Sequence, residues 1–253
     1  GGLSAGTILS EAGDIDSSRP SGHRRAPQRA DSARGGHTLN QEPHPGRCLD
    51  SLRSQLDDLY DQYNDPRWLG PDPLAVVRRY DDPDDIEVAG LLAAALALGN
   101  ATAITRAAEA VLRIFGDHPA SGLASMDDQS IRNALSGFRY RFFDADDLAL
   151  FLSAARNLLA RHGSLELAFL SVDDPAEADY AGTASRFVNA LIGEAGRPEP
   201  WRSNLFPDPA RGSAAKRVFL YLRWMIRRDA VDPGPWRRAD PRRLVVPLDT
   251  HMA

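Results

Sequence analysis

Lys216 is the residue best suited to covalent chemistry. It is the single lysine of the chain. The chain has 30 basic residues of the Lys and Arg types, and the others are all arginine. An amine can lose its proton and act as a nucleophile, whereas a guanidinium effectively cannot. The bias toward arginine either reflects genome composition, with one lysine surviving by chance, or marks Lys216 as a position where arginine cannot substitute.

The segment around Lys216 predicts the start of a helix. Residues 206–228 (FPDPARGSAAKRVFLYLRWMIRR) begin as a Pro/Gly turn and become helical, with Ser213 as the expected N-cap and Lys216 at the third helical position. The positive end of the helix dipole disfavours an ammonium there. The position therefore suits either a nucleophilic amine or a lysine that binds a phosphate together with backbone N–H groups.

A carboxylate that could act with this amine follows 33 residues later. Asp249 lies in PLDTH, residues 247–251, where a proline-containing loop is expected to become a new helix. An aspartate there can simply be an N-cap, and backbone N–H groups would also keep its carboxylate ionised and oriented. Because the sequence ends four residues after Asp249, we expect most of that helix to be missing from it. The resulting hypothesis is that Lys216 and Asp249 meet in one concave, positively charged groove.

The elements that must position these residues are predicted to be helices, so the fold class is all-α. Apolar side chains recur at helical spacing in several segments, and the segment at 86–98 is apolar almost all round, as expected of a buried central helix. Asp144 and Gly163 are the expected start and end of a long helix. No strand pair with a hairpin turn is evident, and the extended run 244–248 contains a proline. The predicted helical segments are 52–63, 86–98, 104–115, 131–135, 144–163, 164–170 and 181–192, besides the one near Lys216.

The composition divides the chain at about residue 48. Residues 1–48 are rich in Gly, Ser, Pro, Arg and His and show no apolar periodicity, which predicts a disordered leader. Residues 49–253 are predicted to form an all-helical domain that is incomplete at its C-terminal end. Cys48 is the one cysteine, which excludes a disulfide framework and a four-cysteine metal site, so we expect neither a metal nor another cofactor.

Charge is distributed unevenly along the chain. The formal net charge is −5, but residues 201–253 hold eleven Lys or Arg against five Asp. A basic C-terminal part of this kind indicates contact with nucleic acid. No apolar run approaches the roughly 20 residues of a membrane span, and no secretory signal is evident, so we expect a cytoplasmic protein without a membrane partner. The sequence identifies no protein partner.

Five motifs carry a resemblance to known proteins. They are LYDQYN (59–64), DIEVAGLLAAALALGN (85–100), FRYRFF (138–143), AAKRVFLYLRWMIR (214–227) and PLDTH (247–251). Through these motifs the chain, from about Leu52 onward, resembles an uncharacterised bacterial family of conserved hypothetical proteins. That family is itself similar to the helix-hairpin-helix DNA glycosylases, most closely to archaeal 8-oxoguanine DNA glycosylases in the separation of the lysine from the aspartate.

The resemblance implies a helix-hairpin-helix glycosylase-like helical bundle and a site. Lys216 matches the Schiff-base lysine, and Asp249 matches the essential aspartate that stabilises an oxocarbenium-like state. Asn100 would fill the gap left by a flipped base, although it could equally be a helix C-cap. The implied function is base excision of a damaged purine from duplex DNA, with or without strand cleavage at the abasic site. The alternatives are a non-catalytic helical module that binds nucleic acid and a structural protein with solvated arginines.

Further residues are expected to contact DNA. The hairpin, Pro207 to Ser213, holds a single glycine where the superfamily usually has two or more. Aromatic side chains in this chain could stack on a base or belong to the core. With Asn100, the expected nucleic-acid-binding residues are Arg139, Arg141, Arg211, Gly212, Ser213, Arg217 and His251. The aromatic candidates are Phe138, Tyr140, Phe142, Trp224 and Trp236.

Overall fold

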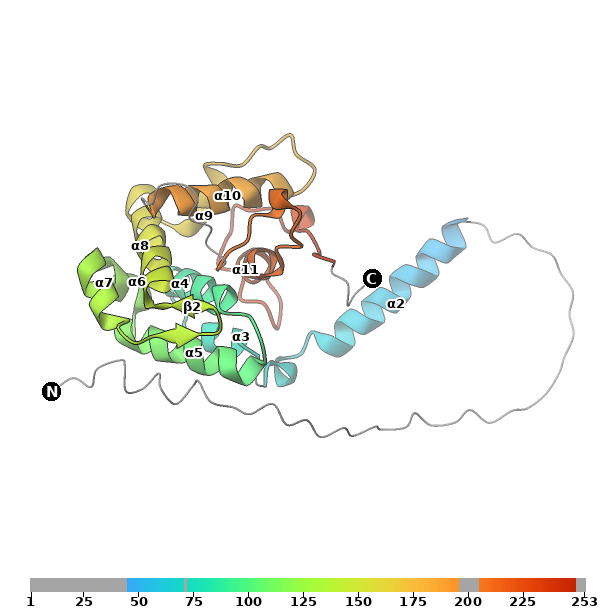
Figure 1. Cartoon of the computed structure of the whole chain (residues 1–253). Helices are drawn as coiled ribbons and strands as arrows, with labels where there is room; N and C mark the ends of the chain where they lie inside the picture. The colour runs from blue at the N-terminus through green and yellow to red at the C-terminus, as the bar shows by residue number, and fades with distance from the viewer. Residues whose placement is uncertain (1–44, 71, 196–204, 249–253) are drawn as a thin grey trace, which may run out of the picture. The chain divides into compact units, whose positions relative to one another are not determined.

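The computed structural model describes residues 45–70, 72–195 and 205–248 (Figure 1). Of the expected leader, residues 1–44 lie outside the described residues, whereas helix α2 (Pro45–Tyr63) already begins at Pro45. The chain divides into compact units after Asn64. One unit contains α2, and the other contains all the remaining elements that the structure describes.

The unit that begins at Asp65 is mostly helical, which confirms the all-α class at this level. Within the part of the chain that the structure describes, no helix combines the length and apolar character that crossing a bilayer requires. In chain order the elements are η2 (Pro66–Leu69), α3 (Leu74–Val77), α4 (Pro83–Ala95), α5 (Ala101–Phe115), α6 (Pro119–Ala124), α7 (Asp128–Ala134), β1 (Arg139–Tyr140), β2 (Phe143–Asp144), α8 (Ala145–His162), α9 (Leu165–Leu170), α10 (Ala181–Glu194), η3 (Pro209–Arg211), α11 (Lys216–Ile226) and η4 (Pro241–Arg243).

Local capping signals set the limits of the long helices. Asp144 accepts a hydrogen bond from the Asp147 backbone N–H, and the Asp147 carboxylate accepts one from the Asp144 N–H, so a complete capping box starts α8. Gly163 ends α8 in the left-handed conformation, and Gly116 ends α5. The expected start of α8 at Asp144 and the expected ends of α8 at Gly163 and of α5 at Gly116 are therefore confirmed.

Helix α4 forms the centre of the core. Its residues from Asp85 to Ala95 are all buried, and it packs against α3, α5, α6 and α11 (Figure 1). Gly90 faces α11, where an added Cβ would lie 2.6 Å from the Cε of Met225. The small residue therefore permits the close approach of the two helices, and α11 is held directly against the most buried element of the fold.

An aromatic cluster joins α9 and α10 to α11. The ring of Phe169 on α9 lies 5.1 Å from Tyr180, 5.7 Å from Phe187 and 5.2 Å from Trp236, measured between centroids. Trp236 in turn meets Tyr221 of α11 edge-on at 5.6 Å. Edge-on and tilted aromatic pairs at these distances stabilise a core beyond their buried area. The segment after α11 is thus anchored in the interior by Trp236.

The expectation that no strand pair occurs was wrong. Strands β1 and β2 form a short antiparallel hairpin, with Arg139 opposite Asp144 and Tyr140 opposite Phe143. Its turn contains Arg141 at φ 56°, a conformation usually marked in sequence by Gly, Asn or Asp, so the local signal was absent. Tertiary contact stabilises the turn instead, because the Tyr140 hydroxyl donates to the carbonyl oxygen of Leu98 at 2.9 Å.

Candidate functional site

The loop before α11 places Lys216 at the first position of the helix. Ala215 is buried and left-handed, at φ 44° and ψ 36°, and acts as the N-cap. The Ser213 hydroxyl accepts from the Ala215 N–H at 3.1 Å inside the loop. Ser213 is therefore not the N-cap, and Lys216 is not at the third helical position, because the left-handed residue delays the start of the helix. Lys216 still lies within the first turn.

Lys216 borders a pocket of about 490 Å³. Its side chain is exposed, so the amine can be reached from solvent. The pocket is lined by residues of α11 and by residues 244–247, the segment that precedes Asp249 in the sequence. Asp249 and His251 themselves lie outside the described residues. The residues that line the pocket are Ala97, Lys216, Arg217, Phe219, Leu220, Arg223, Arg227, Leu244, Val245, Val246 and Pro247.

Two of the four cationic side chains at this pocket are oriented by buried carboxylates. The Nε of Arg223 lies 2.9 Å from an oxygen of Asp232, and the Nε of Arg227 lies 2.6 Å from Asp229 and 3.4 Å from Asp232. Burial raises the pKa of the Asp232 carboxyl, while Arg223 opposes that rise. These pairs fix the loop after α11 against the helix, so the basic lining of the pocket has a defined position.

Arg217 connects the pocket to the hairpin. Its guanidinium donates to the carbonyl oxygen of Ala95 at 2.8 Å and lies 5.5 Å from the centroid of the Phe143 ring. Burial lowers the pKa of Arg217 to about 10, so the side chain remains cationic at neutral pH. Arg217, one of the residues expected to bind nucleic acid, is therefore half-buried. Its contacts hold α11, the end of α4 and the hairpin together.

The hairpin turn brings three of the expected residues to one edge. Arg141 donates from Nε to the Leu98 carbonyl oxygen at 3.3 Å. It also lies against Gly99, at φ 117°, where an added Cβ would be 2.5 Å from its Nη2. The adjacent Asn100 is exposed, and Phe142 at the turn is 82% exposed. Arg139 on β1 is exposed as well.

Asn100 caps the helix that follows it, so its expected alternative role as a C-cap was wrong. Its side-chain oxygen accepts from the Ala103 N–H at 2.8 Å, which makes it the N-cap of α5. The reason is that α4 ends at Ala95, and Leu96 closes it. Asn100 therefore belongs to α5, and its backbone carbonyl oxygen accepts from the Ile104 N–H at 3.1 Å.

Phe142 is the one exposed member of the five aromatic candidates. Phe138, Tyr140, Trp224 and Trp236 are buried to within a few per cent of full coverage. Since a buried ring cannot stack on a base without unfolding the core, only Phe142 remains a candidate for that role among these five.

The loop residues expected to bind phosphate are exposed. Arg211, Gly212 and Ser213 lie directly before α11, and Gly212 is left-handed at φ 75°. The Nε of Arg211 lies 3.6 Å from an oxygen of Asp208. This loop therefore leads directly into the first turn of α11, where Lys216 lies.

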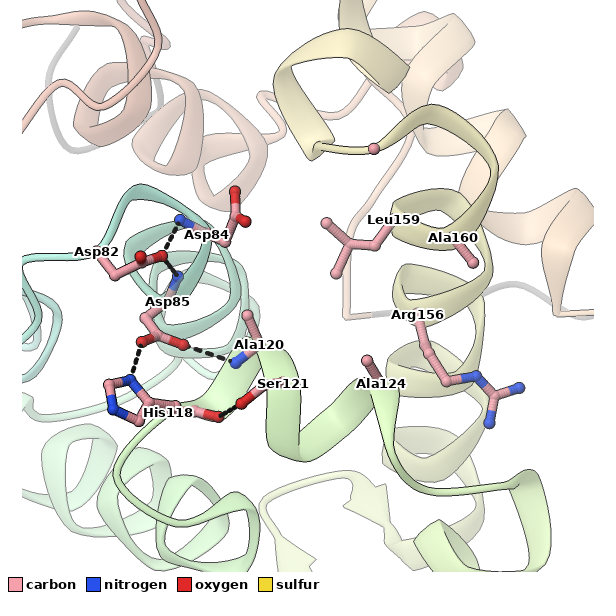
Figure 2. Close-up of a pocket in the computed structure, with 11 residues that line it drawn as sticks. Asp82, Asp84, Asp85, His118, Ala120, Ser121, Ala124, Arg156, Leu159 and Ala160 are labelled. Atoms are coloured by element: carbon pink, nitrogen blue, oxygen red, sulfur yellow. Dashed lines mark hydrogen bonds and ion pairs between the residues drawn. The ribbon is translucent and has the colours of Figure 1, made fainter.

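A second pocket, of about 480 Å³, was missed by sequence reasoning (Figure 2). Buried Asp85 lies with one oxygen 2.9 Å from Nδ1 of His118, and its other oxygen accepts from the Ala120 N–H at 2.8 Å. The hydrogen bond to Asp85 raises the pKa of His118. The possible signal was an aspartate, Asp85, directly before the apolar stretch at 86–98. The lining residues are Asp82, Asp84, Asp85, His118, Ala120, Ser121, Ala124, Arg156, Leu159, Ala160 and Gly163.

Glu87, also missed, fastens the wall of the lysine pocket to the core. Its carboxylate is 2% exposed and accepts from the N–H groups of Leu165 at 2.7 Å and Glu166 at 2.9 Å, and from Nε1 of Trp236 at 2.6 Å. Burial raises the pKa of Glu87 to about 7, against the three donors, which favour the ionised form. Trp236 thereby ties the chain that leads to residues 244–247 to α4 and α9.

No metal centre accompanies either pocket in the described residues, since no group of three or more His, Cys, Asp or Glu there could hold an ion. The fold and site define a mostly helical protein with an exposed lysine at a basic pocket. The chain belongs to a family described as a protein of unknown function, DUF2400, whose sequence profile matches residues 72–253. Comparison with curated proteins and with solved structures finds no match.

Proposed function

We propose that this protein is a DNA glycosylase of the helix-hairpin-helix type that excises a damaged purine from duplex DNA and cleaves the strand at the resulting abasic site. The observation that carries the proposal is the position of Lys216. Lys216 borders a basic pocket of about 490 Å³ that is also lined by residues 244–247, and Asp249 follows this segment two residues later in the sequence. The shared pocket supports a site in which the two residues that the resemblance pairs act together.

The pocket suits the chemistry that this reaction requires. Loss of a base leaves positive charge on the sugar, and a carboxylate near the sugar, supplied by Asp249, would stabilise that state. The amine of Lys216 bonds to the sugar carbon as the base departs with a proton. Opening of the sugar ring, in which the bond from this carbon to the ring oxygen breaks and the oxygen takes up a proton, gives a Schiff base that permits elimination of the 3′ phosphate.

The surface beside the pocket suits a distorted duplex. Arg217 lines the pocket and also lies over Phe143 of the hairpin, so the hairpin turn and the pocket share one structural support. The turn presents Phe142, and Asn100 and Arg141 lie at the same edge. An exposed aromatic ring can occupy the space that a flipped nucleotide vacates, and neighbouring cations can bind phosphates.

The experiment that tests the proposal is reductive trapping. Full-length protein is incubated with duplex DNA that contains an abasic site or an oxidised purine, and borohydride is added. We expect a covalent protein–DNA adduct from the parent protein and none from Lys216→Gln. The matched control is Lys216→Arg, which keeps the cation but cannot form a Schiff base, so it is expected to bind DNA without being trapped.

The same experiment separates the alternative function. If the parent protein binds duplex DNA with an affinity that falls with salt, yet gives no adduct, the protein is a non-catalytic nucleic-acid-binding module. Binding that is insensitive to salt, or no binding, excludes both functions.

A further inference from the structure

Helix α2 carries a stripe of exposed leucines with a heptad spacing. Leu49, Leu52, Leu56 and Leu59 follow one another at intervals of three, four and three residues, and Tyr63 continues the pattern after four. The four leucines, which we call the leucine stripe, are 49% to 65% exposed. Alternation of three and four places them at the a and d positions of a coiled coil, rather than on the broader face of a helix that covers a globular core.

The carboxylates of α2 are kept away from this stripe. Asp50, Asp57, Asp58 and Asp61 fall at the b, c and f positions, on the far side of the helix. The e and g positions, which flank the seam of a coiled coil, hold Arg53, Gln55, Tyr60 and Gln62. No two carboxylates would therefore face each other across a seam formed by two copies of this helix, whereas like charges at those positions specify against self-pairing.

The helix also needs a partner for its own stability. Helices in proteins gain most of their stability from packing of an apolar face against a partner, and the exposed leucines of α2 contribute no such packing while they face water. In addition, α2 lies outside the residues that match the family profile, which begin at residue 72. The stripe is therefore not accounted for by the family domain.

We propose that α2 is a self-association helix, in which the leucine stripe of one chain packs against the leucine stripe of a second copy to form a two-stranded coiled coil. The occupant is a second copy because the stripe is apolar along its length and its flanks are compatible with themselves. The proposal is independent of the lysine pocket, so a failure of the trapping experiment does not affect it.

The test is the mass of the full-length protein in solution, measured by sedimentation equilibrium over a wide range of concentration. The parent protein is expected to have the mass of two chains, and Leu52→Glu/Leu56→Glu is expected to have the mass of one. The matched control, Ser51→Glu/Ser54→Glu, adds the same charge at the c and f positions and is expected to remain a dimer. Circular dichroism verifies that neither variant loses more helical content than the 19 residues of α2 contribute.

Three results would overturn the proposal. The parent protein could have the mass of one chain at all concentrations, in which case the stripe is covered by its own chain or by another protein. The leucine variant could keep the mass of two chains, which would place the interface elsewhere. The control could dissociate together with the leucine variant, which would mean that added charge and not the stripe decides the result.

Discussion

Glu87 should make the stability of this protein depend on pH in a way that one substitution removes. Its carboxyl is buried, and the pKa is raised from its ordinary value of 4.5 to about 7. An acid whose pKa is higher in the folded than in the unfolded state favours folding while it is protonated. The contribution is therefore complete below pH 4.5 and is lost as the pH rises to about 7.

The size of this effect follows from the two pKa values. Each unit of difference between the folded and unfolded pKa corresponds to about 1.4 kcal/mol. The rise from 4.5 to about 7 therefore predicts that the folded state loses about 3 kcal/mol of stability between these two pH values. Above that range the carboxyl is ionised in both states, and its contribution no longer changes.

Urea unfolding of the parent protein and of Glu87→Gln, followed by circular dichroism from pH 4 to 8, measures the loss. All other titrating groups are shared by the two proteins, so they cancel in the difference between the two free energies of unfolding. We expect the parent protein to be stabilised relative to the variant at low pH, and this advantage to shrink by about 3 kcal/mol as the pH rises. In the Glu87→Gln variant, placing an amide among three N–H donors lowers the free energy of unfolding by an amount that does not change with pH. It therefore does not affect how the difference between the two proteins varies with pH.

A flat difference over that pH range would refute the reasoning. It would mean that the N–H donors from Leu165, Glu166 and Trp236 offset the effect of burial, so that Glu87 titrates at the same pH in the folded and unfolded states. A difference that grows with pH would show that these donors hold the pKa below its ordinary value.

Three further outcomes are expected. Phe142→Ala should weaken binding to duplex DNA containing an abasic site by about 1–3 kcal/mol in fluorescence anisotropy, whereas Phe142→Trp should retain binding, since stacking is lost only in the first. The pKa of His118 is raised by its hydrogen bond to Asp85, so the pair should stabilise the fold below pH 6.5 and lose this contribution as the pH rises through the higher folded pKa. In urea unfolding, His118→Gln should abolish this pH-dependent part of the free energy of unfolding. An unchanged pH profile in the variant would contradict the prediction. Asp144→Ala removes the N-cap of the α8 capping box and should lower the free energy of unfolding by about 1 kcal/mol, which a variant at an exposed position without a capping role would not do.

The sequence was most informative where the deciding interactions are local. Asp144 and Asp147 are three residues apart and form the capping box of α8, while Gly163 and Gly116 end their helices by their own backbone conformation. The apolar stretch at 86–98 likewise predicted the central helix, because nearly every residue there is buried in α4. Capping and periodicity act within a few residues, so both can be recognised without knowledge of the fold.

The errors arose where local signals competed or were absent. Ser213 is a good capping residue, but the left-handed Ala215 starts α11 instead. The hairpin turn at Arg141 lacks a residue that favours its φ, and its contacts with Leu98 and Gly99 come from another part of the chain. In such places the conformation does not follow the intrinsic propensity of a residue, because tertiary packing contributes more free energy than the local preference of that residue.

By itself, the sequence determined the helical class, the single lysine and the basic C-terminal part. Only the tertiary structure decided that Lys216 shares a pocket with residues 244–247, that Asp85 faces His118, and that Glu87 holds Trp236, a residue 149 positions away. The physical reason is that these contacts depend on where α4, α9 and α11 pack against one another. No spacing along the chain encodes a distance between side chains that many intervening residues separate.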